Sequence, residues 1–221
     1  MNIKNIKLPE DFGYPVDLLG DIFAKQKELA KKYAVIEGHP GWPCKDINSK
    51  KTQAHIKDFA WRTTEEICEM RKAEEDSVDK EHGYEELGDA LHFLTEMCII
   101  FDYNPRRLRT ESLKPMEAIF EEAKQFSYLD SCDQLIDFEV AKKLSVEAFI
   151  VELGWGMNFL KLKPWKQTGV PTDIPEFLNQ VDKVWIYFAQ VARLRGIKPQ
   201  ELYLLYVKKE LVNRFRLRSN Y

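Results

Sequence analysis

The sequence has few of the features that mark secreted, membrane-spanning or nucleic-acid-binding proteins. Its four cysteines, Cys44, Cys68, Cys98 and Cys132, are scattered and form no CxxC pair, so we expect reduced thiols in a cytoplasmic protein. No apolar run approaches transmembrane length, and the first residues lack the apolar stretch of a signal peptide. The formal net charge of −3 disfavours a broad nucleic-acid-binding surface. We therefore expect neither a membrane nor a nucleic-acid polymer as a partner.

The sequence also lacks convincing strand alternation and any stretch with the composition of a linker. Apolar residues instead recur with a helical period, which predicts an all-α fold: a multi-helix bundle forming one domain over residues 1–221. The predicted helices cover about 17–36, 136–162, 175–194 and 199–217, with two more between about 56 and 100. The less patterned segment 104–150 is a candidate inserted or mobile segment, although it contains a short amphipathic piece at 116–126.

Two acidic pairs of the same design stand on consecutive predicted helices, Glu66-Ile-Cys-Glu69 and Glu86-Leu-Gly-Asp89. Residues three apart lie side by side on a helix. At about 100° per residue, the first carboxylate of each pair falls at the edge of the apolar stripe and the second lies a step further round. If the two helices pack as an antiparallel hairpin, the four carboxylates converge.

Four carboxylates at close range repel one another unless protons or cations lie between them. Oxygen ligands suit Mg²⁺ or Mn²⁺, and Mg²⁺ recruits substrate phosphates to complete its coordination. The repeated pair therefore predicts a Mg²⁺ site for phosphate chemistry. A solvated acidic helix face is the plainer interpretation, because a single ExxE pair carries little information. A di-iron centre that uses Asp89 and His92 is disfavoured, because such centres need a second carboxylate-x-x-His motif on another helix and the chain has only four histidines.

Gln26 interrupts the apolar stripe of the first predicted helix. A buried amide must find hydrogen-bond partners, so Gln26 either bonds to a neighbouring helix or reaches into a ligand pocket. Phe93 lies one helical turn beyond Asp89, on the metal side, where its ring could stack on a ligand. Trp61 is a weaker candidate for the same role, because a core position explains it equally well.

The last predicted helix carries a basic face. Lys209, Asn213 and Arg216 stand at positions i, i+4 and i+7 and so share one side of the helix. Residues 206–221 hold five Lys or Arg against one Glu, a local balance of +4. Such a face opposite an acidic metal cluster would suit a triphosphate. The alternative is a basic helix end that complements its own macrodipole.

Together these residues resemble the all-α nucleoside triphosphate pyrophosphohydrolases, which include MazG-like enzymes and the dimeric dUTPases, among them the phage enzymes that act on dUTP and dCTP. The family pattern ExxE, connector, ExxD is similar to 66–69 and 86–89. The first-helix motif Q-x-x-L is similar to the segment that contains Gln26, with Ala30 where an Asn often follows. The C-terminal signature of the dimeric branch is similar to Lys209, Asn213, Phe215, Arg216 and Tyr221, with Asn220 in place of the usual Gly.

The resemblance implies Mg²⁺-dependent hydrolysis of a deoxynucleoside triphosphate, dUTP first, to the monophosphate and pyrophosphate. It implies two or more Mg²⁺ ions per site, replaceable by Mn²⁺, and a homodimer in the cytoplasm, or in the host cytoplasm for a phage-encoded chain. The metal ligands would be Glu66, Glu69, Glu86 and Asp89, and Glu66 or Glu69 would activate the water that attacks the α-phosphorus. The substrate would contact Gln26, Phe93, Lys209, Asn213, Arg216 and Tyr221.

Two alternatives remain open on the sequence. The substrate could be dCTP or a broader set of deoxynucleotides, because uracil and cytosine differ only in the donors and acceptors of one ring edge. A protein of another class, a non-catalytic helical module that binds a partner protein through its acidic hairpin, would carry the same carboxylates as a charged face.

Overall fold

The computed structural model describes residues 6–9, 11–36, 44, 46–75, 80–125, 137–163, 165–167 and 169–219. Within these ranges the chain forms α-helices and one short 3-10 helix, with no strand, so the prediction of an all-α fold is confirmed. The helices are α1 (Leu18–Ile36), α2 (Lys50–Glu75), α3 (Lys80–Ile100), η2 (Pro105–Leu108), α4 (Pro115–Glu122), α5 (Phe138–Phe159), α6 (Ile174–Arg193) and α7 (Pro199–Arg218).

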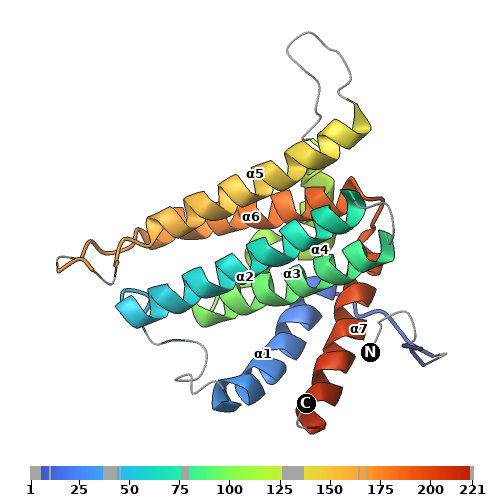
Figure 1. Ribbon diagram of the computed structural model, residues 1–221, viewed down its shortest axis with the longest axis horizontal. Helices are drawn as coiled ribbons and strands as arrows, with labels where there is room; N and C mark the ends of the chain where they lie inside the picture. Colours follow the sequence, from blue (N-terminus) through green and yellow to red (C-terminus); the bar gives the residue numbers. More distant parts are fainter. Residues whose placement is uncertain are drawn as a thin grey trace.

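The two helices that carry the acidic pairs, α2 and α3, occupy the middle of the molecule. They lie side by side and run in opposite directions, and they make the most extensive helix-to-helix contact (Figure 1). The α5–α6 pair packs on one side of them, through α2 and α5. On the other side, α1 and α7 contact each other and α3. Helices from both ends of the chain therefore border the acidic helices.

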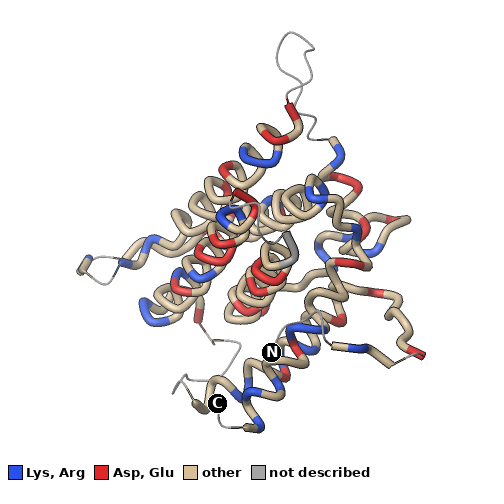
Figure 2. Tube along the Cα trace, turned by 45° about the vertical axis from the view of Figure 1, so that its right-hand side comes forward, with Lys and Arg blue, Asp and Glu red and all other residues tan. Residues whose placement is uncertain are grey.

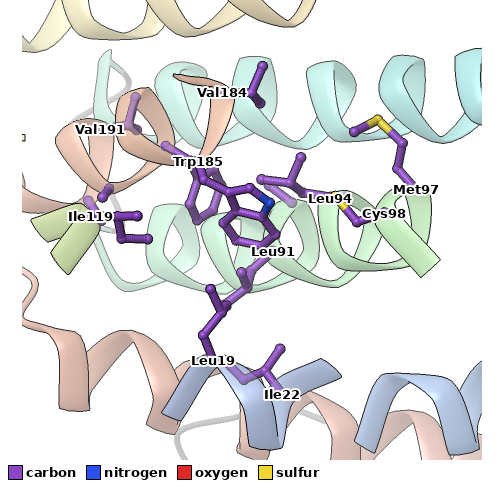
Figure 3. Close-up of a cluster of buried hydrophobic side chains, with 14 of the residues drawn as sticks. Leu19, Ile22, Leu91, Leu94, Met97, Cys98, Ile119, Val184, Trp185 and Val191 are labelled. Carbon is purple, nitrogen blue, oxygen red and sulfur yellow. The ribbon is translucent and has the colours of Figure 1, made fainter. Parts of the chain in front are cut away.

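The apolar core is built around α3. Leu87, Leu91 and Leu94 are fully buried, and Trp185 of α6 lies among the side chains of α3, α1 and α4 (Figure 3). Full burial of each such side chain contributes roughly 1.5–3 kcal/mol relative to exposure. Because α3 is enclosed by packed neighbours, the carboxylates on it are held by a rigid element.

Helix α4 falls within the candidate inserted segment 104–150. Met116 and Ile119 of this helix are buried at 1% exposure or less, and α4 contacts α1 and α6. This part of the segment therefore belongs to the packed core, whereas residues 126–136 lie outside the described part of the chain. Among the described helices, none combines the length and the apolar character that crossing a membrane requires.

The turn before α7 matches its sequence. Gly196 adopts a φ of +77°, a left-handed conformation that favours glycine, and Pro199 occupies the first turn of α7. The Glu201 carboxylate accepts a hydrogen bond from the Lys198 backbone N–H at 2.8 Å, which caps the helix. These features fix where α7 begins, and with it the position of its basic face.

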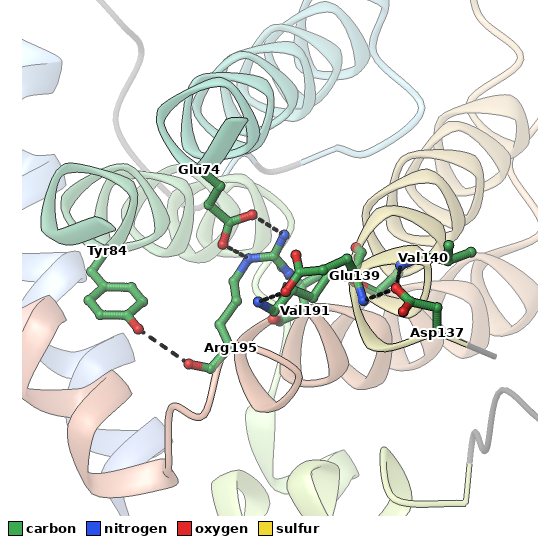
Figure 4. A network of polar contacts seen from close by, with 9 residues as sticks. Glu74, Tyr84, Asp137, Glu139, Val140, Val191 and Arg195 are labelled. Atoms are coloured by element: carbon green, nitrogen blue, oxygen red, sulfur yellow. Dashed lines mark hydrogen bonds and ion pairs between the residues drawn. The ribbon is translucent and has the colours of Figure 1, made fainter. Parts of the chain in front are cut away.

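Arg195, in the same turn, joins three helices at one end of the acidic hairpin (Figure 4). Its guanidinium forms a two-point ion pair with Glu74 of α2, with Nε–Oε1 at 2.7 Å and Nη2–Oε2 at 2.8 Å. The Tyr84 hydroxyl of α3 donates to the Arg195 carbonyl at 3.3 Å. Only 2% of the Arg195 side chain is exposed. This contact holds the end of α2 and the start of α3 against the end of α6.

Candidate functional site

Three of the four predicted carboxylates converge between α2 and α3. Glu66, Glu86 and Asp89 each offer an oxygen, and these atoms lie within 4.8 Å of one another. Glu69, the fourth, is outside this group and its side chain is exposed. Position 69 lies further round α2 than position 66, toward solvent, whereas both carboxylates of the α3 pair reach the cluster.

The electrostatics of this cluster favour a bound cation. Burial, the hydrogen bond to Glu86 and the nearby charge of Asp89 raise the pKa of Glu66 to about 8. Burial also raises the pKa of Asp89, against the opposing effect of Lys209. Clustered carboxylates with raised pKa values are disfavoured as anions until a proton or a cation compensates them. Three convergent hard oxygen donors are a ligand set that suits Mg²⁺ or Mn²⁺.

A pocket of about 310 Å³ lies beside the cluster. This volume is at the lower end of the range for small-molecule sites. Glu66 and Asp89 form part of its wall, together with five of the six predicted substrate-binding residues: Gln26, Phe93, Lys209, Asn213 and Arg216. The sixth, Tyr221, lies outside the described residues. Side chains from α1, α2, α3 and α7 thus meet at one cavity.

The basic face of α7 meets the acidic cluster directly. The Lys209 ammonium forms an ion pair with the Asp89 carboxylate, and both side chains are largely buried. Asn213 and Arg216 continue along the same face and line the pocket. Arg216 is close enough to act on the pKa of Asp89, which its charge lowers. Donors for phosphate oxygens therefore stand next to the carboxylates.

Gln26 lies in the wall of the pocket and is only 2% exposed. Its Nε2 donates to Glu96 Oε2 at 2.9 Å, and its Oε1 accepts from the Tyr206 hydroxyl at 3.0 Å. His92 Nδ1 lies 2.8 Å from the same oxygen. Both interpretations of Gln26 are therefore compatible: it is hydrogen-bonded to neighbouring helices and it also lines the cavity.

His92 is engaged on both sides of its ring. Nδ1 faces Gln26, and Nε2 lies 3.2 Å from the Tyr206 carbonyl oxygen. Burial lowers the pKa of His92 to about 3, so the ring is neutral. The imidazole stacks on the Tyr206 ring at 4.2 Å between centroids. His92 is not a member of the carboxylate group.

An aromatic wall borders the pocket on the α2 side. The Phe59 and Phe93 rings lie 6.2 Å apart, and the Arg62 guanidinium stands 4.9 Å from the Phe59 ring centre and 5.8 Å from that of Phe93. Cation–π contacts of this kind hold a guanidinium in place. Trp61, suggested as a stacking residue, is 62% exposed and is not among the residues that line the pocket.

Sequence reasoning missed several lining residues, although helical spacing could have found most of them. Arg62 stands one turn before Glu66, and Glu96 stands two turns beyond Asp89, on the same side of α3. The others recur at helical spacing from residues already singled out. The missed residues are Leu29, Tyr33, Phe59, Arg62, Glu96 and, as a pocket residue, His92.

Charge elsewhere on the molecule is mixed. Figure 2 shows Lys and Arg interspersed with Asp and Glu along the helices in that view. The chain as a whole carries 33 basic and 36 acidic residues. Because these charges nearly balance, the net charge gives the molecule no strong electrostatic potential of one sign. The electrostatic character of the pocket therefore comes from the particular side chains around it.

The comparisons with known proteins identify one family. A family model described as dUTPase matches residues 69–221. The match begins at Glu69, the second residue of the first acidic pair, and includes α3, α7 and their pocket residues, whereas Gln26 and Glu66 precede it. No curated protein and no solved structure matched the chain. Because the family match spans more than half of the 221 residues, the chain belongs to the dUTPase family.

Proposed function

We propose that this protein hydrolyses dUTP to dUMP and pyrophosphate in a Mg²⁺-dependent reaction. One observation carries the proposal: a single pocket joins a carboxylate cluster, a Lys–Asn–Arg face and a buried amide beside aromatic rings. These groups match the parts of a nucleotide, with carboxylates for cations on the phosphates, basic groups for the phosphates themselves, and an amide with aromatic rings for the base. Family membership supports dUTP as the substrate.

Glu66, Glu86 and Asp89 are the residues that would hold Mg²⁺. When bound, the metal would neutralise charge on the triphosphate and polarise its phosphorus–oxygen bonds. The raised pKa of Glu66 supports this assignment, because a cation removes the repulsion that burial and neighbouring carboxylates create. Glu69 stays a candidate ligand through its proximity to Glu66, whose pKa its charge helps to raise.

The basic face of α7 would hold the phosphates. Lys209 would leave its ion pair with Asp89 in part and contact phosphate oxygens, while Arg216 would bind the outer phosphates and Asn213 would donate a hydrogen bond. Fixed donors aimed at developing charge lower the barrier because they need no reorganisation during the reaction. Tyr221 is proposed to add a further hydrogen bond.

In the chemical step a water oxygen bonds to the α-phosphorus, and the bond from that phosphorus to the bridging oxygen of the β-phosphate breaks. The products are dUMP and pyrophosphate. We assign the orientation of this water to Glu69, which lies outside the three-carboxylate group and keeps an exposed carboxylate, with Glu66 as the second candidate. A carboxylate that accepts the water proton acts as general base.

The base would enter between Gln26 and the aromatic wall. Phe93 offers a ring face, and Gln26 offers an amide that can read a pyrimidine edge. Arg62 over the rings of Phe59 and Phe93 closes this side of the cavity. The dUTPase match favours uracil, and a panel that includes dCTP decides between the two pyrimidines.

The test measures pyrophosphate and monophosphate release from dUTP, dCTP, dTTP, dATP, dGTP and the ribonucleotides, with Mg²⁺ and with chelator. Metal-dependent release from dUTP is expected, with ¹⁸O from labelled water appearing in dUMP because attack occurs at the α-phosphorus. Glu69→Gln should abolish turnover, whereas Glu65→Gln, one position from Glu66 and exposed, should retain it. Full activity of Glu69→Gln would show the site assignment to be wrong.

The assembly that we propose is a homodimer. Large apolar side chains are exposed on α2 and α5, two helices that contact each other: Trp61, Val151 and Trp155 are each more than half exposed. Exposed apolar area of this kind marks interaction surfaces when it is contiguous. Light scattering on the purified protein should give twice the chain mass of 26.0 kDa, and a single chain mass would exclude the dimer.

A further inference from the structure

Six lysines gather on a surface outside the pocket beside the carboxylate cluster. They belong to residues 49–57, around the start of α2, and residues 158–172, at and after the end of α5, two segments that contain no Asp or Glu. Both segments lie at the same end of the molecule (Figure 1). The near balance of charge over the whole chain therefore hides a local excess of one sign. The six are Lys50, Lys51, Lys57, Lys161, Lys163 and Lys166.

Hydrogen bonds join the two segments into one platform. The Gln53 side chain is fully buried, and its Oε1 accepts from the Leu162 backbone N–H at 2.9 Å. Its Nε2 donates to the Thr172 hydroxyl, also at 2.9 Å. The Lys50 ammonium donates to the Lys166 carbonyl oxygen at 2.6 Å. Because a buried amide connects the segments, the lysines on them are held in a defined arrangement.

The lysines lie close enough to repel one another. The Lys57 ammonium donates to the Leu160 carbonyl oxygen at 2.8 Å, and burial together with the charges of Lys163 and Lys161 lowers the pKa of Lys57. Within the described part of the chain, no carboxylate forms an ion pair with any of the six lysines. Like charges held together without a counter-charge attract an anionic partner.

An aromatic side chain stands among these lysines. Trp165 is 75% exposed, and the Lys163 ammonium lies 5.6 Å from the centre of its ring, a cation–π contact. An exposed indole offers a face on which a nucleobase can stack, whatever the base. Lysines for phosphates beside an aromatic ring for a base are the components of sites for single-stranded nucleic acid.

We propose that this lysine surface binds single-stranded nucleic acid, with phosphates on the lysines and a base stacked on Trp165. Positions 50 and 57 are about 10 Å apart along α2, so the surface extends beyond a single phosphate group. The net charge of −3 disfavours a broad nucleic-acid-binding surface, whereas this one is confined to two segments. The proposal goes beyond nucleotide hydrolysis and does not depend on it.

An anionic membrane is the other class of partner that lysines beside exposed apolar side chains could fit. The contact between Lys163 and Trp165 disfavours it, because an ammonium held against the indole would lose water if the ring entered the lipid. Vesicles of phosphatidylcholine and phosphatidylserine therefore serve as the second probe in the test.

The experiment measures the fluorescence anisotropy of a labelled oligothymidylate of about 12 nucleotides over a range of salt concentrations. The wild type should bind it, and the logarithm of the association constant should fall linearly with the logarithm of salt concentration. The slope is about −0.7 per phosphate contacted, or about −4 if all six lysines take part. Absence of binding at low salt would overturn the proposal.

Two variants separate the charges from the ring. Lys51→Gln combined with Lys161→Gln, both at exposed positions, should weaken binding roughly tenfold near 0.1 M salt and make the slope shallower by about 1.4. Trp165→Ala should also weaken binding about tenfold but leave the slope unchanged, because it removes stacking and no charge. An unchanged affinity in either variant would overturn the proposal. Circular dichroism and the melting temperature check that each variant is folded.

The chain offers a matched control for the loss of two charges. Lys114 and Lys183 are exposed and lie outside both segments, before α4 and on α6. Lys114→Gln combined with Lys183→Gln should leave the affinity and the slope as in the wild type. An equal loss in this control would indicate a general effect of charge and overturn the proposal.

A further variant excludes binding in the substrate pocket. Lys209→Met removes a cation that lines the pocket and should leave binding of the oligonucleotide unchanged. A loss confined to Lys209→Met would place the strand in the pocket and overturn the proposal, as would binding to vesicles without binding to the oligonucleotide. Absence of dUTP turnover would overturn the proposed function and leave this inference standing.

Discussion

The carboxyl groups of Glu66 and Glu86 are hydrogen-bonded to each other across the α2–α3 interface. Two carboxylates can share such a bond only if one of them carries a proton. Burial and the neighbouring negative charges raise the pKa of Glu66 from an ordinary 4.5 to about 8, so the metal-free pair holds a proton at neutral pH. A cation that binds here must displace that proton.

Mg²⁺ binding should therefore release a proton near pH 7. Calorimetric titrations in two buffers of different ionisation enthalpy measure the number released, since the apparent binding enthalpy changes with the buffer. We expect up to one proton per site at pH 7, and an affinity that rises between pH 6 and 8 as Glu66 ionises. Glu66→Gln should bind Mg²⁺ more weakly and release no proton. Equal enthalpies in the two buffers would contradict the shared proton.

The same pKa shift predicts how stability varies with pH. Glu66 has a higher pKa in the folded chain, about 8, than in the unfolded chain, near 4.5. The folded state therefore binds the proton more tightly, and its advantage is present below pH 4.5 and lost as pH rises toward 8. In chelator, Tm should fall by a few degrees between pH 5 and 8. Glu66→Gln should flatten this dependence, whereas Glu65→Gln should keep the wild-type slope.

Lys209 gives a test of the phosphate-binding face at a residue that is ion-paired with the proposed metal ligand Asp89. Lys209→Met should lower kcat/KM for dUTP by about 10²–10³, because one donor to the developing charge is lost. Lys208→Met is the matched control: it removes the same charge one position away, outside the pocket lining, and should change kcat/KM less than threefold. Similar losses in both variants would indicate a general effect of charge and exclude a specific contact.

Much of the site could be predicted from the sequence, because the angle between successive residues of a helix is nearly constant. Positions 209, 213 and 216 were predicted to share a face, and the structure places all three in the pocket wall. Of the four carboxylates expected to converge, Glu66, Glu86 and Asp89 form the group within 4.8 Å, and Glu69 lies outside it. Helical spacing places Glu69 a step further round α2 than Glu66, but the depth of the α2–α3 contact decides whether its carboxylate reaches the cluster.

What the sequence could not supply are partners brought together by packing between distant helices. Gln26 and Tyr206 are 180 positions apart, and their hydrogen bond depends on how α1 and α7 meet against α3. Glu96 appears in the sequence as one acidic residue in an apolar stretch, and only the packing of α1 against α3 brings it to Gln26. Local periodicity assigns faces to helices but does not determine which faces meet.

The Arg195–Glu74 ion pair yields a prediction about stability alone. Arg195→Met removes the guanidinium and leaves Glu74 without its cation, which should lower the free energy of unfolding by about 2–4 kcal/mol. Adding Glu74→Leu should recover part of the loss, because the double variant leaves no unpaired charge. Neither residue lines the pocket beside the carboxylate cluster, so kcat for dUTP should stay within twofold of wild type in both variants. Urea unfolding and steady-state kinetics on the same preparations measure both quantities. If kcat fell together with the free energy of unfolding, the ion pair would instead hold α2 and α3 in the arrangement that the carboxylate cluster requires.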